Sequence, residues 1–305
     1  MWEPCDLYEH EKEKRECLQK AMSWCDVGHV YLRLDQKDLA QKAFEEARST
    51  WPNLFEACTG LGQLHAERRE YAAAVNLCVA GCTPAIGPAV VCAVVVLRLL
   101  GRCQLITALE LAEYGTRKLG YSVYLVGTMA TVLEKLGETK KARKIMQKLR
   151  KKHRKDVDEL GFIGDQYMGM NETAPAQEVF AEVIGLSPQN MEYRVKLAEL
   201  LESSSDAKTA IDAWLEVIKL DGNHELAHRS VGCLLYNSGR YHEAILHFKQ
   251  AVSLIPDSAC NRFLLANCYK MLGHKDLFRE QLQMAAGLDK NYEQFLNAED
   301  EDVAW

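Results

Sequence analysis

The sequence contains no long uncharged hydrophobic run, which excludes a membrane-spanning helix of ordinary length. Its longest apolar stretch, residues 89–100, is too short to cross a bilayer and contains Arg98. We interpret this stretch as a buried helix, with a partner-binding surface as the alternative. The first six residues have neither a basic region nor an apolar one, so no secretory signal peptide is expected. The predicted location is cytoplasmic, with a nuclear location as the alternative.

The chain also lacks an excess of positive charge. Lys and Arg number 37 against 43 Asp and Glu, and the net charge at pH 7 is −6. The overall charge therefore gives no indication of a nucleic-acid-binding surface. One local exception is residues 140–155, where ten of sixteen residues are Lys or Arg. This run is either a solvated helix face, a contact for an acidic or phosphate-rich partner, or a nuclear-import signal.

No two cysteines have CxxC spacing, and the 11 cysteines are an odd number. We interpret them as small buried apolar residues in a reducing compartment, since a disulfide framework usually has an even set. A zinc site built from Cys78, Cys82, Cys92 and Cys103 is the alternative, although the repeat described next already explains Cys78. No cofactor and no metal are expected.

What the sequence does contain is a strict repeat of 34 residues. Seven of eight residues at this spacing are alanine, and the eighth is Phe278. If Ala fills about a tenth of positions, chance gives this with odds of roughly one in a million. Twelve residues before each of these positions, seven of eight residues are Gly or Ala, and an apolar residue precedes each one. The alanines are Ala40, Ala74, Ala108, Ala142, Ala176, Ala210 and Ala244.

Small residues at one position and large apolar residues four positions later are typical of two closely packed antiparallel helices. The pattern resembles the tetratricopeptide repeat, most clearly in residues 24–52 and 231–256. The resemblance implies an all-α fold, an α-solenoid in which antiparallel helix pairs form a right-handed superhelix. Eight repeats would cover residues 21–292, starting at residues 21, 55, 89, 123, 157, 191, 225 and 259.

Two segments flank the predicted repeats. Residues 1–20 are expected to form an N-terminal capping segment, with Cys17 and Leu18 among its inner positions. Residues 293–305 form an acidic C-terminal tail that ends in Trp305. Repeat arrays usually end in a polar cap. Here the cap looks short or missing, so either a partner or a second copy covers the last hairpin, or the tail is frayed.

The resemblance also implies a partner-binding groove, lined by positions 2, 5, 9 and 12 of the first helix of each repeat. Carboxylates in repeats 5 and 6 favour a basic partner segment, and an apolar patch in repeat 3 favours an amphipathic one. The Lys and Asn clamp of the chaperone-binding members is absent, so that role is not expected. The predicted groove residues are Cys25, His29, Thr59, Gln63, Leu97, Tyr124, Thr131, Asp165, Glu192, Glu199, Arg229, Tyr236, Phe263 and Asn267.

The sequence therefore predicts a non-enzymatic scaffold or adaptor that binds a protein segment in its groove. An obligate structural subunit of a large multiprotein assembly is the alternative. A remote alternative is a zinc metalloprotease, because residues 224–228, HELAH, match the HExxH motif. The repeat boundary passes through this motif, so its two histidines are not expected on one helix face.

Overall fold

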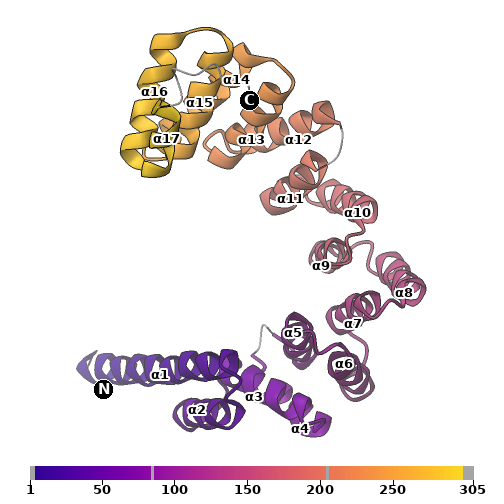
Figure 1. Cartoon of the computed structure of the whole chain (residues 1–305). Coiled ribbons are helices and arrows are strands. Elements are labelled where there is room, and N and C mark those ends of the chain that lie inside the picture. Colours follow the sequence, from indigo (N-terminus) through magenta and orange to yellow (C-terminus); the bar gives the residue numbers. More distant parts are fainter. Residues whose placement is uncertain (1–3, 84–85, 204–205, 298–305) are drawn as a thin grey trace. The chain divides into compact units, whose positions relative to one another are not determined.

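The computed structural model describes residues 4–83, 86–203 and 206–297, with side chains described from residue 11 to residue 296. Every regular element in these residues is a helix, and the helices follow one another in pairs (Figure 1). The contacts between helices divide the chain into two units, Met1–Glu172 and Thr173–Trp305, and each unit is described by itself.

The helices of both units are short, apart from the first. Those of unit 1 are α1 (Pro4–Arg33), α2 (Lys37–Thr50), α3 (Phe55–Glu67), α4 (Tyr71–Ala80), α5 (Pro88–Gly101), α6 (Leu105–Leu119), α7 (Val123–Lys135), α8 (Thr139–Lys152) and α9 (Val157–Gly169). Those of unit 2 are α10 (Thr173–Leu186), α11 (Met191–Glu202), α12 (Ala207–Leu220), α13 (Glu225–Asn237), α14 (Tyr241–Leu254), α15 (Ala259–Met271), α16 (Lys275–Leu288), the 3-10 helix η1 (Lys290–Tyr292) and α17 (Glu293–Asn297).

The helices keep the spacing of the sequence repeat. Each even-numbered helix from α2 to α16 begins 34 residues after the one before it. Within each unit a helix packs against its neighbours in the chain. Successive odd-numbered helices also contact one another in unit 1, as α13 and α15 do in unit 2. The predicted all-α fold and solenoid of helix pairs are therefore confirmed.

The alanine column marks the closest approach of the paired helices. All seven alanines are fully buried, and Phe278, which replaces Ala in the last pair, is 9% exposed. Two glycines that lie twelve residues before an alanine of the column are also constrained, each by the phenylalanine four residues after that alanine. A Cβ atom on Gly28 would lie 2.6 Å from the ring of Phe44, and one on Gly232 would lie 2.7 Å from the ring of Phe248. Because even a methyl group does not fit at these contacts, the sequence needs small residues there.

The N-terminal segment continues directly into the first repeat. Helix α1 runs without a break from Pro4 to Arg33, so described residues 4–20 extend the first repeat helix instead of forming a separate element. Leu18 packs against the core formed by α1, α2 and α3, as predicted. Cys17 is exposed, which corrects its prediction as an inner position.

The C-terminal segment packs on the last helix pair. The ring of Phe263 on α15 lies 4.9 Å from the ring of Tyr292 and 4.9 Å from that of Phe295. Phe295 and Leu296 belong to the core of unit 2. The last pair therefore carries a short cap of its own, which is the first of the two alternatives, a short cap or a missing one. Residues 298–305 of the predicted tail lie outside the described residues.

Candidate functional site

Four of the predicted groove residues hold helices together and do not face solvent. Cys25, Thr59, Gln63 and Thr131 are 2%, 0%, 3% and 4% exposed. The Thr131 hydroxyl donates a hydrogen bond of 2.7 Å to the amide oxygen of Gln166, which joins α7 to α9. Because the odd-numbered helices approach one another closely at these positions, a partner cannot reach these side chains. This corrects the groove prediction for the four residues.

None of the other predicted residues of unit 1 is fully buried. Leu97 on α5 is 39% exposed. The His29 ring packs edge-on against Phe44 at 5.2 Å, and the Tyr124 ring packs against Phe162 at 4.8 Å. Asp165 on α9 is half-buried. The structure does not bring these four side chains together into a pocket.

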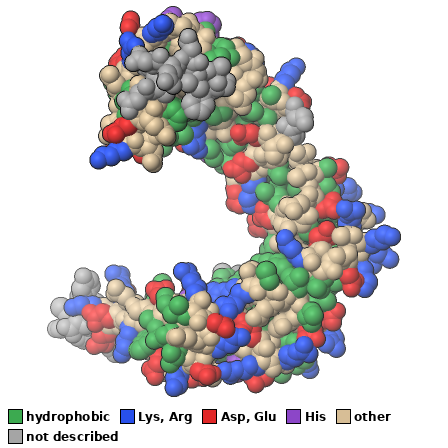
Figure 2. All heavy atoms as spheres, viewed as in Figure 1, with side chains coloured by type: hydrophobic (Ala, Val, Ile, Leu, Met, Phe, Trp, Pro, Cys, Tyr) green, Lys and Arg blue, Asp and Glu red, His purple; other side chains and the backbone are tan. Residues whose placement is uncertain are grey.

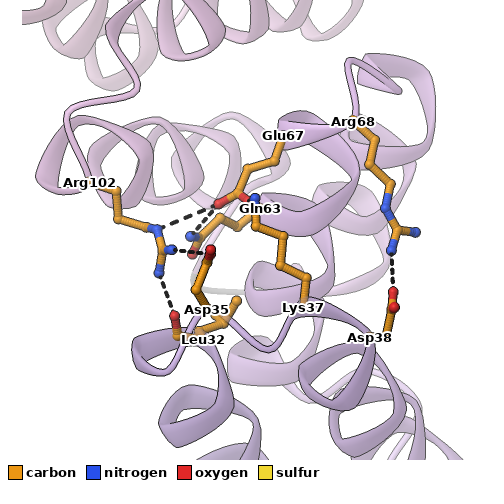
Figure 3. A network of polar contacts seen from close by, with 8 residues as sticks. All are labelled: Leu32, Asp35, Lys37, Asp38, Gln63, Glu67, Arg68 and Arg102. Carbon is orange, nitrogen blue, oxygen red and sulfur yellow. Dashed lines mark hydrogen bonds and ion pairs between the residues drawn. The ribbon is translucent and has the colours of Figure 1, made fainter.

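A buried carboxylate in unit 1 was missed by the sequence. The Glu67 side chain at the end of α3 is 3% exposed, and the Lys37 ammonium lies 2.8 Å from its carboxylate. The Arg102 guanidinium lies 3.6 Å from the same carboxylate and donates a hydrogen bond of 3.0 Å to the carbonyl of Leu32 (Figure 3). This network therefore ties the turns of three successive helix pairs together.

The network also controls the ionisation of Glu67. Burial by itself raises the pKa of this carboxyl, because it disfavours the charged form. Hydrogen bonds from Lys37 and Gln63 and the charges of Lys37 and Arg102 outweigh burial, so the pKa of Glu67 lies below its ordinary value. This carboxylate is a structural anion and not a binding group.

Unit 2 contains a surface hollow of about 490 Å³, which we call the acidic depression. It is lined by side chains from α11, α12, α13 and α15, and it includes the predicted groove residues Glu199 and Arg229. Its apolar floor is formed by two leucines, because the indole ring of Trp214 is fully buried behind it, and two glutamates also line it. The lining residues are Glu199, Glu202, Trp214, Leu226, Arg229, Ser230, Cys233, Cys260 and Leu264.

The charges around the depression leave it negative. Glu202 accepts a hydrogen bond of 2.9 Å from the indole nitrogen of Trp214, which fixes its carboxylate at the rim. Arg229 lies 3.7 Å from the carboxylate of Glu225 on the preceding turn, so its positive charge is offset. Among the residues that the structure describes, no cation pairs with Glu199 or Glu202. The depression therefore offers two unneutralised carboxylates to a ligand.

The thiol of Cys233 in the depression is not a nucleophile. Burial, followed by the charge of Glu202, raises the pKa of Cys233 to about 11. At neutral pH the sulfur therefore stays protonated and serves as an apolar part of the lining.

The remaining predicted residues of unit 2 have partners within the chain. Glu192 pairs with Lys196 at 2.8 Å, and the ring of Tyr236 packs against that of Tyr241 at 5.3 Å. Phe263 packs against Tyr292 and Phe295 of the C-terminal segment and is partly buried, so its assignment to the groove stays a prediction. Asn267 on α15 is half-buried and does not line the depression.

The two histidines of HELAH have different structural roles. His224 precedes α13, and its Nδ1 accepts a hydrogen bond of 3.2 Å from the backbone nitrogen of Ala227. His228 is 8% exposed, and its Nε2 lies 3.1 Å from the carbonyl of Gly222 while its Nδ1 lies 3.2 Å from Nδ1 of His247. Both ring nitrogens of His228 are thus engaged, and nothing supports the metalloprotease alternative.

The cysteines considered for zinc are not gathered either. Cys78 and Cys92 are buried, Cys82 is half-buried and Cys103 is exposed. Within the described ranges, no three His, Cys, Asp or Glu side chains lie close enough together to hold a metal ion.

Comparison with known proteins agrees with this geometry. Three family models described as tetratricopeptide repeat match residues 25–81, 128–156 and 235–299. Together with the constant spacing of the helix pairs, these matches identify the chain as a tetratricopeptide repeat protein. No match was found among curated proteins. In the described part of the chain, no helix is both long and apolar enough to cross a bilayer.

Solved structures with a similar fold include MamA and YrrB. The sequence of MamA, known from a crystal structure, is 18% identical to this one. The alignment covers 59% of this chain and 97% of MamA, with a TM-score of 0.45. YrrB is described as a TPR protein with an unusual peptide-binding site, and its sequence is 18% identical to this one. The alignment covers 59% of this chain and 93% of YrrB, with a TM-score of 0.47.

Proposed function

We propose that the chain is a non-enzymatic protein-interaction scaffold and that unit 2 binds a basic, amphipathic partner segment in its acidic depression. The observation that carries this proposal is the combination of an apolar floor, formed by Leu226 and Leu264, with the unneutralised carboxylates of Glu199 and Glu202. A bound segment would place one large apolar side chain over the floor and a Lys or Arg at the rim.

The position of the depression also supports a role in recognition. Its lining comes from the rigid odd-numbered helices α11, α13 and α15 and from α12, so no loop has to reorganise before a segment binds. Preformed sites lose little conformational entropy on binding, which favours useful affinity from a small contact area.

A random peptide library displayed against the full chain tests this proposal. Selected peptides should be enriched in Lys or Arg next to a large apolar residue. An exposed charge pair contributes about 0.2–1 kcal/mol. Two such pairs contribute about 0.4–2 kcal/mol, so the double variant E199Q/E202Q should weaken the binding of a selected peptide by about two- to thirty-fold in isothermal titration.

The matched control is E280Q, which removes an exposed carboxylate from α16, outside the depression. It should leave the affinity of the selected peptide unchanged. Enrichment of acidic peptides, or equal losses in E280Q and E199Q/E202Q, would show that the depression is not the binding site.

A further inference from the structure

Helix α8 in unit 1 carries a dense positive charge on its outer face. Residues 139–155 contain ten Lys and Arg and no Asp or Glu. The apolar side chains Ala142, Met146 and Leu149 are buried, whereas nine of the ten cationic residues are exposed. Lys and Arg side chains gather on the part of the surface formed by α8 (Figure 2).

Most of these lysines have no carboxylate partner among the residues that the structure describes. Arg143 donates a hydrogen bond of 2.6 Å to Glu172, and Lys141 pairs with Glu138. The ammonium of Lys152 lies 3.4 Å from the ring centre of Tyr121. Four further lysines form what we call the lysine stripe: Lys140, Lys144, Lys148 and Lys151. Between described residues, no carboxylate pairs with any of these four.

The lysine stripe follows one face of the helix. Its members are four, four and three residues apart, a spacing that places side chains above one another on an α-helix. At 1.5 Å per residue the stripe is about 16 Å long. Each strand of a duplex carries regularly spaced phosphates, so a row of lysines on successive helical turns can contact several of them.

The residue types are compatible with a phosphate backbone as the ligand. The planar fork of an Arg guanidinium matches carboxylate and phosphate alike, whereas the stripe consists only of Lys. Lys is a point charge, which suits a backbone of regularly spaced phosphates. Since phosphate contacts carry no sequence information, such a surface would bind without base preference.

Two other observations distinguish a duplex from a membrane and from a single strand. Helix α8 has no exposed apolar side chain that could enter a bilayer, because Ile145 is half-buried and Met146 and Leu149 are buried. The nearby Tyr121 ring already packs against the His153 ring, at 5.8 Å and 7° between the ring planes, and against Lys152. Tyr121 is 50% exposed, but stacking on an unpaired base would have to displace one of these two ring contacts.

We infer that the lysine stripe of α8 binds the phosphate backbone of a nucleic-acid duplex without reading its sequence. This site lies in unit 1 and is independent of the peptide-binding function proposed for unit 2. The shared chemistry is the phosphate backbone, which RNA and DNA duplexes both supply.

The test measures binding of the full chain to 24-base-pair RNA and DNA duplexes by fluorescence anisotropy between 50 and 200 mM salt. Each neutralised phosphate contributes about −0.9 to the slope of log affinity against log salt. Four lysines should therefore give a slope of about −3.6. The variant K140Q/K144Q/K148Q/K151Q should bind at least ten-fold more weakly at 50 mM salt, with a flatter slope.

The matched control is K42Q/K208Q/K249Q/K275Q, which removes the same charge from exposed lysines of four other helices. It should bind within about two-fold of the unmodified chain. Gln and Lys have similar helix propensity, so both variants should keep the unmodified thermal melt. If the stripe variant unfolds, the salt slope of the unmodified chain still tests the inference.

Equal affinity for both duplexes would support recognition of the phosphate backbone that RNA and DNA share. Tighter binding of one duplex would identify that nucleic acid as the ligand. The inference is overturned if neither duplex binds at 50 mM salt, or if the control loses as much affinity as the stripe variant. It is also overturned if poly-glutamate or phosphatidylserine vesicles bind more tightly than either duplex.

Discussion

At the scale of single residues, the turn inside each helix pair requires a left-handed backbone. Gly137, Gly239 and Gly273 have φ of 84°, 74° and 75°, and four other residues adopt similar angles at equivalent positions. Glycine occupies this region without a steric penalty, whereas other residues lose about 1 kcal/mol. The four residues are Asp35, Arg69, Cys103 and Asn171, with φ of 56°, 63°, 58° and 56°.

Replacement of Cys103 by Gly should therefore stabilise the protein. Its thiol is exposed and its φ is 58°, so C103G relieves backbone strain without opening a cavity. We expect a gain of about 0.5–1 kcal/mol in urea unfolding, after the extra chain entropy of glycine is subtracted. C103A, which keeps the strain, should give no comparable gain. G239A should lose about 1 kcal/mol, and a neutral result for both C103G and G239A would contradict this reasoning.

Also at this scale, the buried Glu67 should make stability depend on pH. The pKa of Glu67 is below its ordinary value of 4.5, so its stabilising effect is fully present above pH 4.5. The effect is lost as pH falls through the lowered pKa of the folded state. Since removal of one partner from a buried ion pair is costly, E67Q should lose about 3 kcal/mol at pH 7. Below pH 4, the difference in unfolding free energy between E67Q and the unmodified chain should become smaller, as measured by chemical denaturation.

The control for this prediction is the neighbouring exposed pair. Arg68 and Asp38 are 3.4 Å apart, and the Asp38 side chain is 92% exposed (Figure 3). D38N should therefore cost less than about 1 kcal/mol and show little dependence on pH. Similar losses in D38N and E67Q would mean that burial of the Glu67 network has no special effect.

At the scale of helices, most of the fold could be predicted from one column of alanines. The column fixed the repeat length, and the even-numbered helices begin at a constant interval of 34 residues. Prediction succeeded because each repeat packs chiefly against its neighbours, so local spacing determines the architecture.

The same reasoning was less successful for the binding surface. The sequence register cannot reveal how closely two odd-numbered helices approach, so Thr59 and Thr131 were predicted to face a partner although they are buried. The Glu67 network was missed because Lys37 and Arg102 come from other helix pairs. The contacts of Phe263 with Tyr292 and Phe295 were also missed, because both partners come from the non-repeating C-terminal segment.

At the scale of the whole molecule, the net charge of −6 is an average over a chain that carries one basic surface and one acidic surface. The lysine stripe lies in unit 1, and the acidic depression lies in unit 2. The two proposals therefore make separable predictions. E199Q/E202Q should affect only peptide binding, and the stripe variant should affect only duplex binding.

The central claim is that unit 2 binds a partner segment in its acidic depression. Hydrogen exchange of the full chain, measured by mass spectrometry with and without a selected basic peptide, tests this claim most directly. We predict that the peptide slows exchange in α11, α13 and α15 and leaves α8 unchanged. Protection confined to other helices, or none at saturating peptide, would contradict the claim.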